Sequence, residues 1–178
     1  AAESRPESAK PWVVLVTGVN GIRKTTSIYE PWFGDALREA IVGPGGARAD
    51  VEDLPVGSTS FFRQLDFVIA TAANEDFRRL YGIEDVAAYA AAKDAIFSRY
   101  RTVAEMVGAL LVAEAKTRDL NVMLETSGRD VAMFEYVDHF FPDDHYRKLA
   151  LNFEIEDLGF AERSVDARML GEMARGRA

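Results

Sequence analysis

One short stretch of the chain combines residue types that bind phosphate. It runs from Gly18 to Thr26 and reads Gly-Val-Asn-Gly-Ile-Arg-Lys-Thr-Thr. Its glycine, lysine and threonine have the spacing of the pattern Gly-x-x-x-x-Gly-Lys-(Ser/Thr), whose backbone N–H groups surround phosphate. In that pattern the lysine, here Lys24, reaches the terminal phosphates, and the hydroxyl beside it, here Thr25, is a magnesium ligand. The stretch therefore predicts a site for a phosphorylated ligand with Mg²⁺.

One position of this pattern is not matched. Arg23 stands where the second glycine is expected. A glycine there lets the backbone approach phosphate closely, often in a conformation that a side chain resists. Two outcomes follow from the sequence. Either Arg23 adds positive charge for the phosphate, or it obstructs the pocket and the loop no longer binds nucleotide.

The segments around the loop are those that the motif requires. The β-branched run from Trp12 to Val16 is typical of a strand buried on both faces. A helix is expected from about Lys24, interrupted near Pro31 and continued from Phe33 to Val42. Few accidental matches would combine the motif with a strand before it and a helix after it.

A carboxylate follows a second predicted strand. Asn121 to Leu124 reads as a buried strand, and Glu125 comes directly after it. We expect Glu125 at the carboxyl end of a central strand, the edge where open α/β sheets bind ligands. It could orient magnesium or act as a base there, or it could simply cap the next helix.

The remaining segments alternate between helix and strand. Helices are expected over 61–72, 74–81, 84–118 (as two helices), 130–141 and 157–177, with a third strand over 148–155. Residues 42–60 form a Gly/Pro-rich loop without an apolar period, and residues 1–10 read as a flexible tail. The pattern predicts a single domain over residues 11–178, an α/β fold with a mostly parallel sheet.

The two motifs together resemble the zeta-toxin-like group of P-loop small-molecule kinases. Gly18, Gly21, Lys24 and Thr25 fall into register with the family's loop. The run Glu-Thr-Ser-Gly-Arg from Glu125 is similar to the family's Glu-Gly-Thr-Gly-Arg, and the resemblance spans roughly residues 12–168. It implies a P-loop NTPase-type three-layer sandwich, and it leaves open whether the sheet is complete at the C-terminal end. It also implies transfer of the ATP γ-phosphate to a hydroxyl of a small molecule such as a nucleotide sugar.

The resemblance also implies roles for individual residues. The nucleotide-binding set is Gly18, Asn20, Gly21, Ile22, Arg23, Lys24, Thr25 and Thr26. Within it Lys24 is also catalytic, and Thr25 holds Mg²⁺. The acceptor would lie against Thr126, Ser127 and Arg129, beside Glu125.

Two further catalytic features of the family have weaker counterparts. The family's general base is an aspartate on a second strand, and the nearest candidate is Asp66, in a stretch whose spacing predicts a helix. The family also brings arginines from a lid helix to the transferred phosphate. Arg163 and Arg168 on the last predicted helix could serve, or they could belong to a solvated charged face.

Two other interpretations stay open. The loop and the Glu-Thr-Ser-Gly-Arg run are also similar to motifs of signal-recognition-particle GTPases, although no Thr-Lys-x-Asp guanine-reading motif is present. Alternatively, a P-loop kinase-like fold serves as a catalytically inactive subunit or scaffold that binds protein partners. Arg23, the position of Asp66 and the small number of predicted strands favour this second interpretation.

The composition excludes several classes of protein. The 178 residues include 21 basic and 29 acidic side chains, a net charge of −8, which disfavours a nucleic-acid-binding surface. Without cysteine there is no disulfide scaffold, thiolate metal site or cysteine nucleophile. No apolar run approaches the ~18 residues of a membrane span. We expect a soluble intracellular protein of the cytoplasm or an organelle interior, and the absence of an initial Met permits a removed transit peptide.

Overall fold

A parallel sheet of three strands forms the middle of the fold. The computed structural model describes residues 10–43, 56, 61–128 and 131–176, and for residues 61–64 and 66 it describes the backbone alone. Strands β1 (Trp12–Thr17), β2 (Val122–Glu125) and β3 (Arg147–Asn152) are parallel in the order β2-β1-β3. The predicted α/β fold with a parallel sheet is confirmed. The expectation that the strand before Glu125 is central is wrong, because β1 is the middle strand of the described sheet and β2 lies at its edge.

Alternate residues of β1 supply the cores on the two faces of the sheet. Val13 and Leu15 pack with Val112, Val137 and Phe141, from or beside α5 (Val86–Thr117) and α6 (Ala132–Phe140). On the opposite face, buried β1 side chains pack with Phe33 and Leu37 of α2 (Pro31–Val42). Side chains of a strand point alternately to the two faces, so an uninterrupted apolar run is what a doubly covered strand requires. Helices therefore cover both faces of this sheet.

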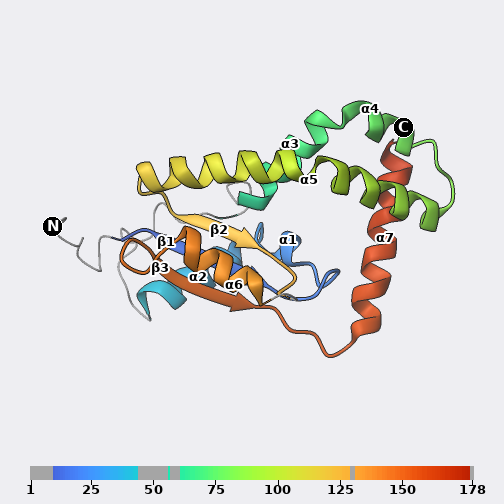
Figure 1. Cartoon of the computed structure of the whole chain (residues 1–178). Helices are drawn as coiled ribbons and strands as arrows, with labels where there is room; N and C mark the ends of the chain where they lie inside the picture. Colours follow the sequence, from blue (N-terminus) through green and yellow to red (C-terminus); the bar gives the residue numbers. More distant parts are fainter. Residues whose placement is uncertain (1–9, 44–55, 57–60, 129–130, 177–178) are drawn as a thin grey trace.

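The helix α5 links the sheet to a second core. Its C-terminal half lies over the sheet, whereas its N-terminal half packs with α4 (Asn74–Leu80) and α7 (Leu158–Gly176) (Figure 1). The members of this second core are Ala73, Leu80, Tyr89, Ile96 and Met173. The expectation of two helices over 84–118 is wrong, because α5 is a single helix of 32 residues. The segment is alanine-rich and contains no proline, so nothing interrupts its hydrogen bonds.

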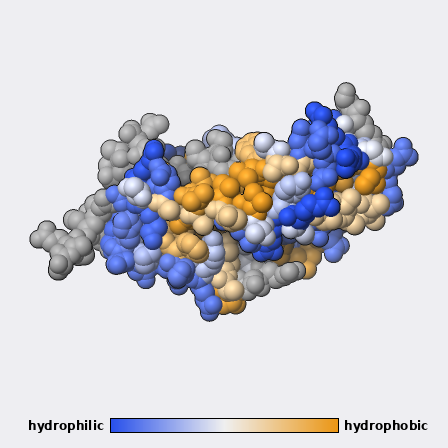
Figure 2. Space-filling view, turned by 45° about the horizontal axis from the view of Figure 1, so that its top comes forward, coloured by the Kyte–Doolittle hydropathy of each residue, from blue (hydrophilic) through white to orange (hydrophobic). Residues whose placement is uncertain are grey.

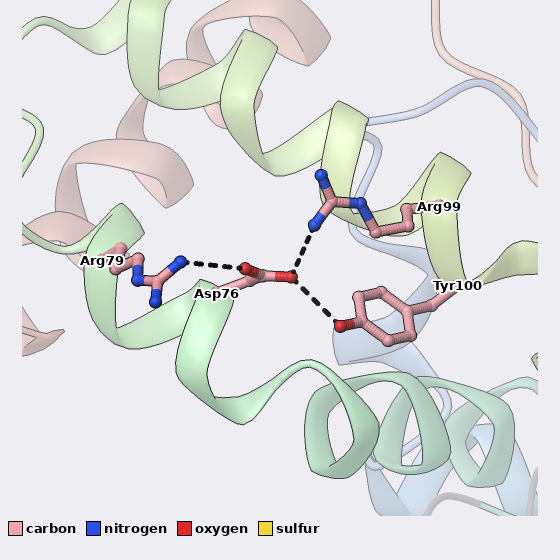
Figure 3. Close-up of polar contacts among 4 residues, drawn as sticks. All are labelled: Asp76, Arg79, Arg99 and Tyr100. Atoms are coloured by element: carbon pink, nitrogen blue, oxygen red, sulfur yellow. Dashed lines mark hydrogen bonds and ion pairs between the residues drawn. The ribbon is translucent and has the colours of Figure 1, made fainter.

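Contacts of the Asp76 carboxylate with Arg99 and Tyr100 link α4 to α5 (Figure 3). The Asp76 carboxylate accepts hydrogen bonds from Arg99 Nη1 at 3.1 Å and from the Tyr100 hydroxyl at 3.1 Å. Arg79, one turn along α4, lies 3.9 Å from the other carboxylate oxygen. The two helices therefore meet through polar contacts at their surface and apolar side chains beneath.

Most remaining boundaries agree with the sequence within a few residues. The predicted break near Pro31 is confirmed, because α1 (Lys24–Ser27) is a single turn and Pro31 begins α2. Helix α3 (Phe61–Ala72) is confirmed, and β3 ends at Asn152 rather than Ile155. Residues 1–9, 44–55 and 57–60, which hold most of the expected tail and loop, lie outside the described residues. None of the helices in the described part combines the length and the apolar character that crossing a membrane requires.

Candidate functional site

The loop between β1 and α1 is organised around a buried lysine. Lys24 is only 6% exposed, and its Nζ donates to the carbonyl oxygens of Gly18 at 2.5 Å and Val19 at 3.1 Å. Burial lowers the pKa of this ammonium, an effect that Glu125 opposes and Arg168 increases. The amine therefore lies inside the loop, held by the same backbone that the motif predicts will surround phosphate.

The hydroxyl beside this lysine contacts the carboxylate at the end of β2. Thr25 Oγ1 donates to Glu125 Oε1 at 2.7 Å, although the two residues are 100 positions apart in the chain. Because β1 and β2 are parallel neighbours, the loop after β1 and the carboxyl end of β2 lie at the same edge of the sheet. The two predicted motifs are thus brought together by the strand pairing.

Helix α7 approaches the loop at Gly21. Gly21 has φ +88°, and a Cβ atom placed on it would lie 2.1 Å from the carbonyl oxygen of Ala161. Only a glycine permits this contact in this backbone conformation. Beside it, Arg23 adopts the left-handed conformation with φ 67°, and its guanidinium lies 5.4 Å from the centre of the Phe160 ring. The Arg23 side chain is exposed and directed toward α7.

A cavity of about 670 Å³ lies between this loop and two helices. The loop side is lined by Asn20, Gly21, Arg23, Lys24, Thr25, Thr26 and Glu125. The opposite side consists of Ala90, Lys93, Asp94 and Phe97 from α5 and of Ser164, Arg168, Met169 and Glu172 from α7. We call this second set the helical wall. Lys93 Nζ and Glu172 Oε2 form an ion pair that joins the two helices of the wall.

The charge of the cavity differs from that of the whole chain. Among the described residues, its lining has four basic side chains (Arg23, Lys24, Lys93 and Arg168) and three acidic ones (Asp94, Glu125 and Glu172), a formal charge of +1. The chain as a whole carries −8. Basic side chains are therefore concentrated where the motif predicts an anion.

The structure brings together most of the loop residues predicted to bind nucleotide. Asn20, Gly21, Arg23, Lys24, Thr25 and Thr26 line the cavity with Glu125 and Arg168. Gly18 contributes the carbonyl that holds Lys24. The Ile22 side chain lies against Gly18 and is not part of the lining.

The other predicted residues are placed differently. Thr126 and Ser127 follow β2 but are not among the described lining residues, and Arg129 lies outside the described residues. Arg163 is exposed and pairs with Asp157 at 3.1 Å, away from the cavity lining. Asp66 lies on helix α3, as the spacing of its segment predicted, and not on a strand as the family's general base does. The structure describes only the backbone of this residue.

Sequence reasoning missed the helical wall, apart from Arg168. The α5 residues of the wall recur at i, i+3, i+4 and i+7, the spacing of one helix face. That spacing could have grouped Lys93, Asp94 and Phe97. Nothing local in an alanine-rich helix indicates which face meets the loop, because the approach of α7 and α5 to the loop is set by the second core.

The comparisons with known proteins do not extend this description. No protein-family model matches the chain, no curated protein matches it, and no solved structure matches it. What the site can bind is therefore inferred from its own residues and geometry alone.

The donor set at the loop suits magnesium. A hydroxyl and a carboxylate oxygen 2.7 Å apart are hard oxygen ligands of the kind that Mg²⁺ prefers. Within the part of the chain that the structure describes, no group of three or more His, Asp or Glu residues could hold a metal ion by itself.

Proposed function

We propose that this protein is an ATP-dependent phosphotransferase that moves the γ-phosphate of ATP to a hydroxyl of a small molecule. The observation that carries the proposal is the contact between Thr25 and Glu125 beside the buried Lys24, at the edge of one cavity. A loop lysine, a hydroxyl and a strand-end carboxylate are the parts that hold a magnesium–nucleotide complex in this type of loop.

The chain's own residues would act mainly by position and charge. Lys24 would exchange its two carbonyl contacts for phosphate oxygens, which favours the charged ammonium and offsets its burial. Arg168 and Arg23 line the same cavity and would neutralise further negative charge. Thr25 and Glu125 would hold Mg²⁺, which supplies neutralisation of the phosphate oxygens when bound. Helix α1 has only four residues, so the loop N–H groups and these side chains would provide most of the attraction.

The direct test is binding of Mg-ATP measured by isothermal titration calorimetry. Wild type is expected to bind, and Lys24→Met is expected to weaken binding by about 100-fold, since charged hydrogen bonds contribute about 1.5–3 kcal/mol each. Thr25→Val should weaken binding in the presence of Mg²⁺ more than in its absence.

A matched control uses a lysine remote from the cavity. Lys116→Met, in the last turn of α5, should bind as wild type does. Circular dichroism melts of all variants distinguish lost binding from lost folding. Absence of Mg-ATP binding by a folded wild-type protein would contradict the proposal.

A second candidate function is a non-catalytic subunit of an assembly. Exposed apolar side chains on α5 support it, because Val103, Met106 and Leu110 recur at i, i+3 and i+7 and are 48%, 66% and 71% exposed. Figure 2 shows apolar residues gathered in the middle of the face that α5 crosses. Light scattering after size-exclusion chromatography tests this candidate. A stable oligomer that does not bind Mg-ATP would favour it over the kinase.

A further inference from the structure

The cavity has a second side that the nucleotide-binding motif does not use. The loop side and Arg168 account for phosphate and magnesium, whereas the rest of the helical wall carries a separate set of polar and apolar groups. Of the residues predicted from the resemblance to hold the acceptor, Thr126 and Ser127 are not among the described lining residues, and Arg129 lies outside the described residues. An acceptor must nevertheless lie in the same cavity as the γ-phosphate for an in-line displacement.

Three carboxylates line this cavity in the described part of the chain, and two of them have partners that define other roles. Glu125 accepts a hydrogen bond from Thr25 at the position proposed for magnesium. Glu172 forms the ion pair with Lys93 that joins α7 to α5. Asp94 is the remaining carboxylate, exposed on the cavity face of α5.

We infer that the helical wall is the acceptor subsite and that Asp94 is the general base of the transfer. This inference rests on the proposed function. Asp94 Oδ takes the proton of the acceptor hydroxyl as its oxygen forms a bond to the γ-phosphorus. The bond from that phosphorus to the β,γ-bridging oxygen breaks, and ADP leaves with the electron pair, so atoms and charge balance.

The neighbours of Asp94 fit this role. Lys93 and Phe97 flank it on the same face of α5, and Met169 faces them from α7. Phe97 and Met169 are half-buried and offer an apolar surface for the carbon framework of an acceptor. The ion pair of Lys93 with Glu172 joins the two helices that form the subsite.

The test separates nucleotide binding from transfer. Mg-ATP binding is measured by calorimetry, and ADP formation is measured with water alone and with added glycerol as acceptors. Asp94→Asn should bind Mg-ATP as wild type does but form ADP about 100-fold more slowly, the usual contribution of a general base. Asp94→Glu should restore part of the rate, because it keeps a carboxylate.

Two further variants make the outcome specific. Glu125→Gln should weaken Mg-ATP binding itself, because the Glu125 carboxylate contacts Thr25 at the position proposed for magnesium. Asp166→Asn is the matched control, since Asp166 is exposed on α7 and does not line this cavity. It should leave both binding and turnover unchanged.

Each outcome decides the inference. Slow turnover with normal binding in Asp94→Asn, rescued by Asp94→Glu, would support it. Turnover of Asp94→Asn within about threefold of wild type, well short of the general-base effect, would overturn it and leave the proposed function intact. A wild type that binds Mg-ATP but forms no ADP would also overturn it and would favour the non-catalytic subunit. A wild type that does not bind Mg-ATP would overturn both proposals.

Discussion

The two sides of the cavity are built in different ways. The loop side is local: one continuous stretch after β1 contains Gly21, Arg23, Lys24 and Thr25, and one strand pairing adds Glu125. The helical wall is assembled from two helices whose cavity residues are about 70 positions apart in the numbering. Its geometry depends on the second core and not on any motif. The positions of the motif residues can therefore be predicted from the sequence, whereas the surface that faces them is a product of tertiary packing.

The largest effect is expected from a cavity in the second core. Leu80 is 2% exposed and packs with Tyr89, Ile96 and Met173. Leu80→Ala should lower the free energy of unfolding by about 3 kcal/mol, the usual effect of removing a buried leucine side chain. Hydrogen exchange should rise in α4, α7 and the N-terminal half of α5 more than in β1. An equal rise of hydrogen exchange in β1 would contradict the view that the second core supports the helical wall independently of the sheet that carries the loop.

The next effect concerns the contact between α7 and the loop. Gly21→Ala places a Cβ atom against the Ala161 carbonyl and forces a side chain onto a left-handed φ. We expect the free energy of unfolding to fall by about 2 kcal/mol and Mg-ATP binding to weaken. Gly34→Ala is the control, because a Cβ there meets nothing within 4 Å and the residue lies in α2. It should raise stability by about 0.5–1 kcal/mol, and similar results for the two variants would refute the close contact.

Much of the loop side and little of the helical wall could be predicted from the sequence. The apolar run before Gly18, the break at Pro31 and the carboxylate at the end of β2 each have a local signal, and the structure has all three features. The order of the strands has no local signal in the sequence. The strand β2 was therefore expected in the centre of the sheet, whereas it lies at the edge of the described sheet. The continuity of α5 was also missed. An alanine-rich segment without proline permits one long helix, but whether it folds as one helix or two depends on packing. The role of Asp94 follows only from the position of α5 relative to the loop.

A smaller effect is expected from the ion pair within the helical wall. Lys93 and Glu172 have side chains 18% and 25% exposed, so their attraction is less screened than that of a surface pair. A double-mutant cycle with Lys93→Met and Glu172→Gln should give a coupling of about 1 kcal/mol. The exposed pair Arg101–Glu105 on the same helix is the comparison and should give a smaller coupling. Equal coupling energies would mean that the Lys93–Glu172 pair does not stabilise the contact between α5 and α7 more than a surface pair would.

The smallest effect is expected at Arg23. Arg23→Gly relieves a left-handed backbone conformation, which stabilises the fold by about 1 kcal/mol, and it removes the Phe160 contact of about 0.5 kcal/mol. The net gain in the free energy of unfolding should be about 0.5 kcal/mol. Mg-ATP binding should weaken by about threefold, since an exposed cation at the cavity contributes less than 1 kcal/mol. Tighter binding would mean instead that Arg23 obstructs the pocket.

The central claim is that the loop and the helical wall form one site for a nucleotide and its acceptor. Hydrogen exchange of the full chain with and without Mg-ATP tests it most directly, because both sides are read in the same experiment. Mg-ATP should protect residues 18–27 and 122–128 strongly, and it should also slow exchange in 90–97 and 164–172. Protection of residues 18–27 without slower exchange in 90–97 and 164–172 would mean that the loop and the helical wall do not form one site. No protection of residues 18–27 at saturating Mg-ATP would contradict the claim.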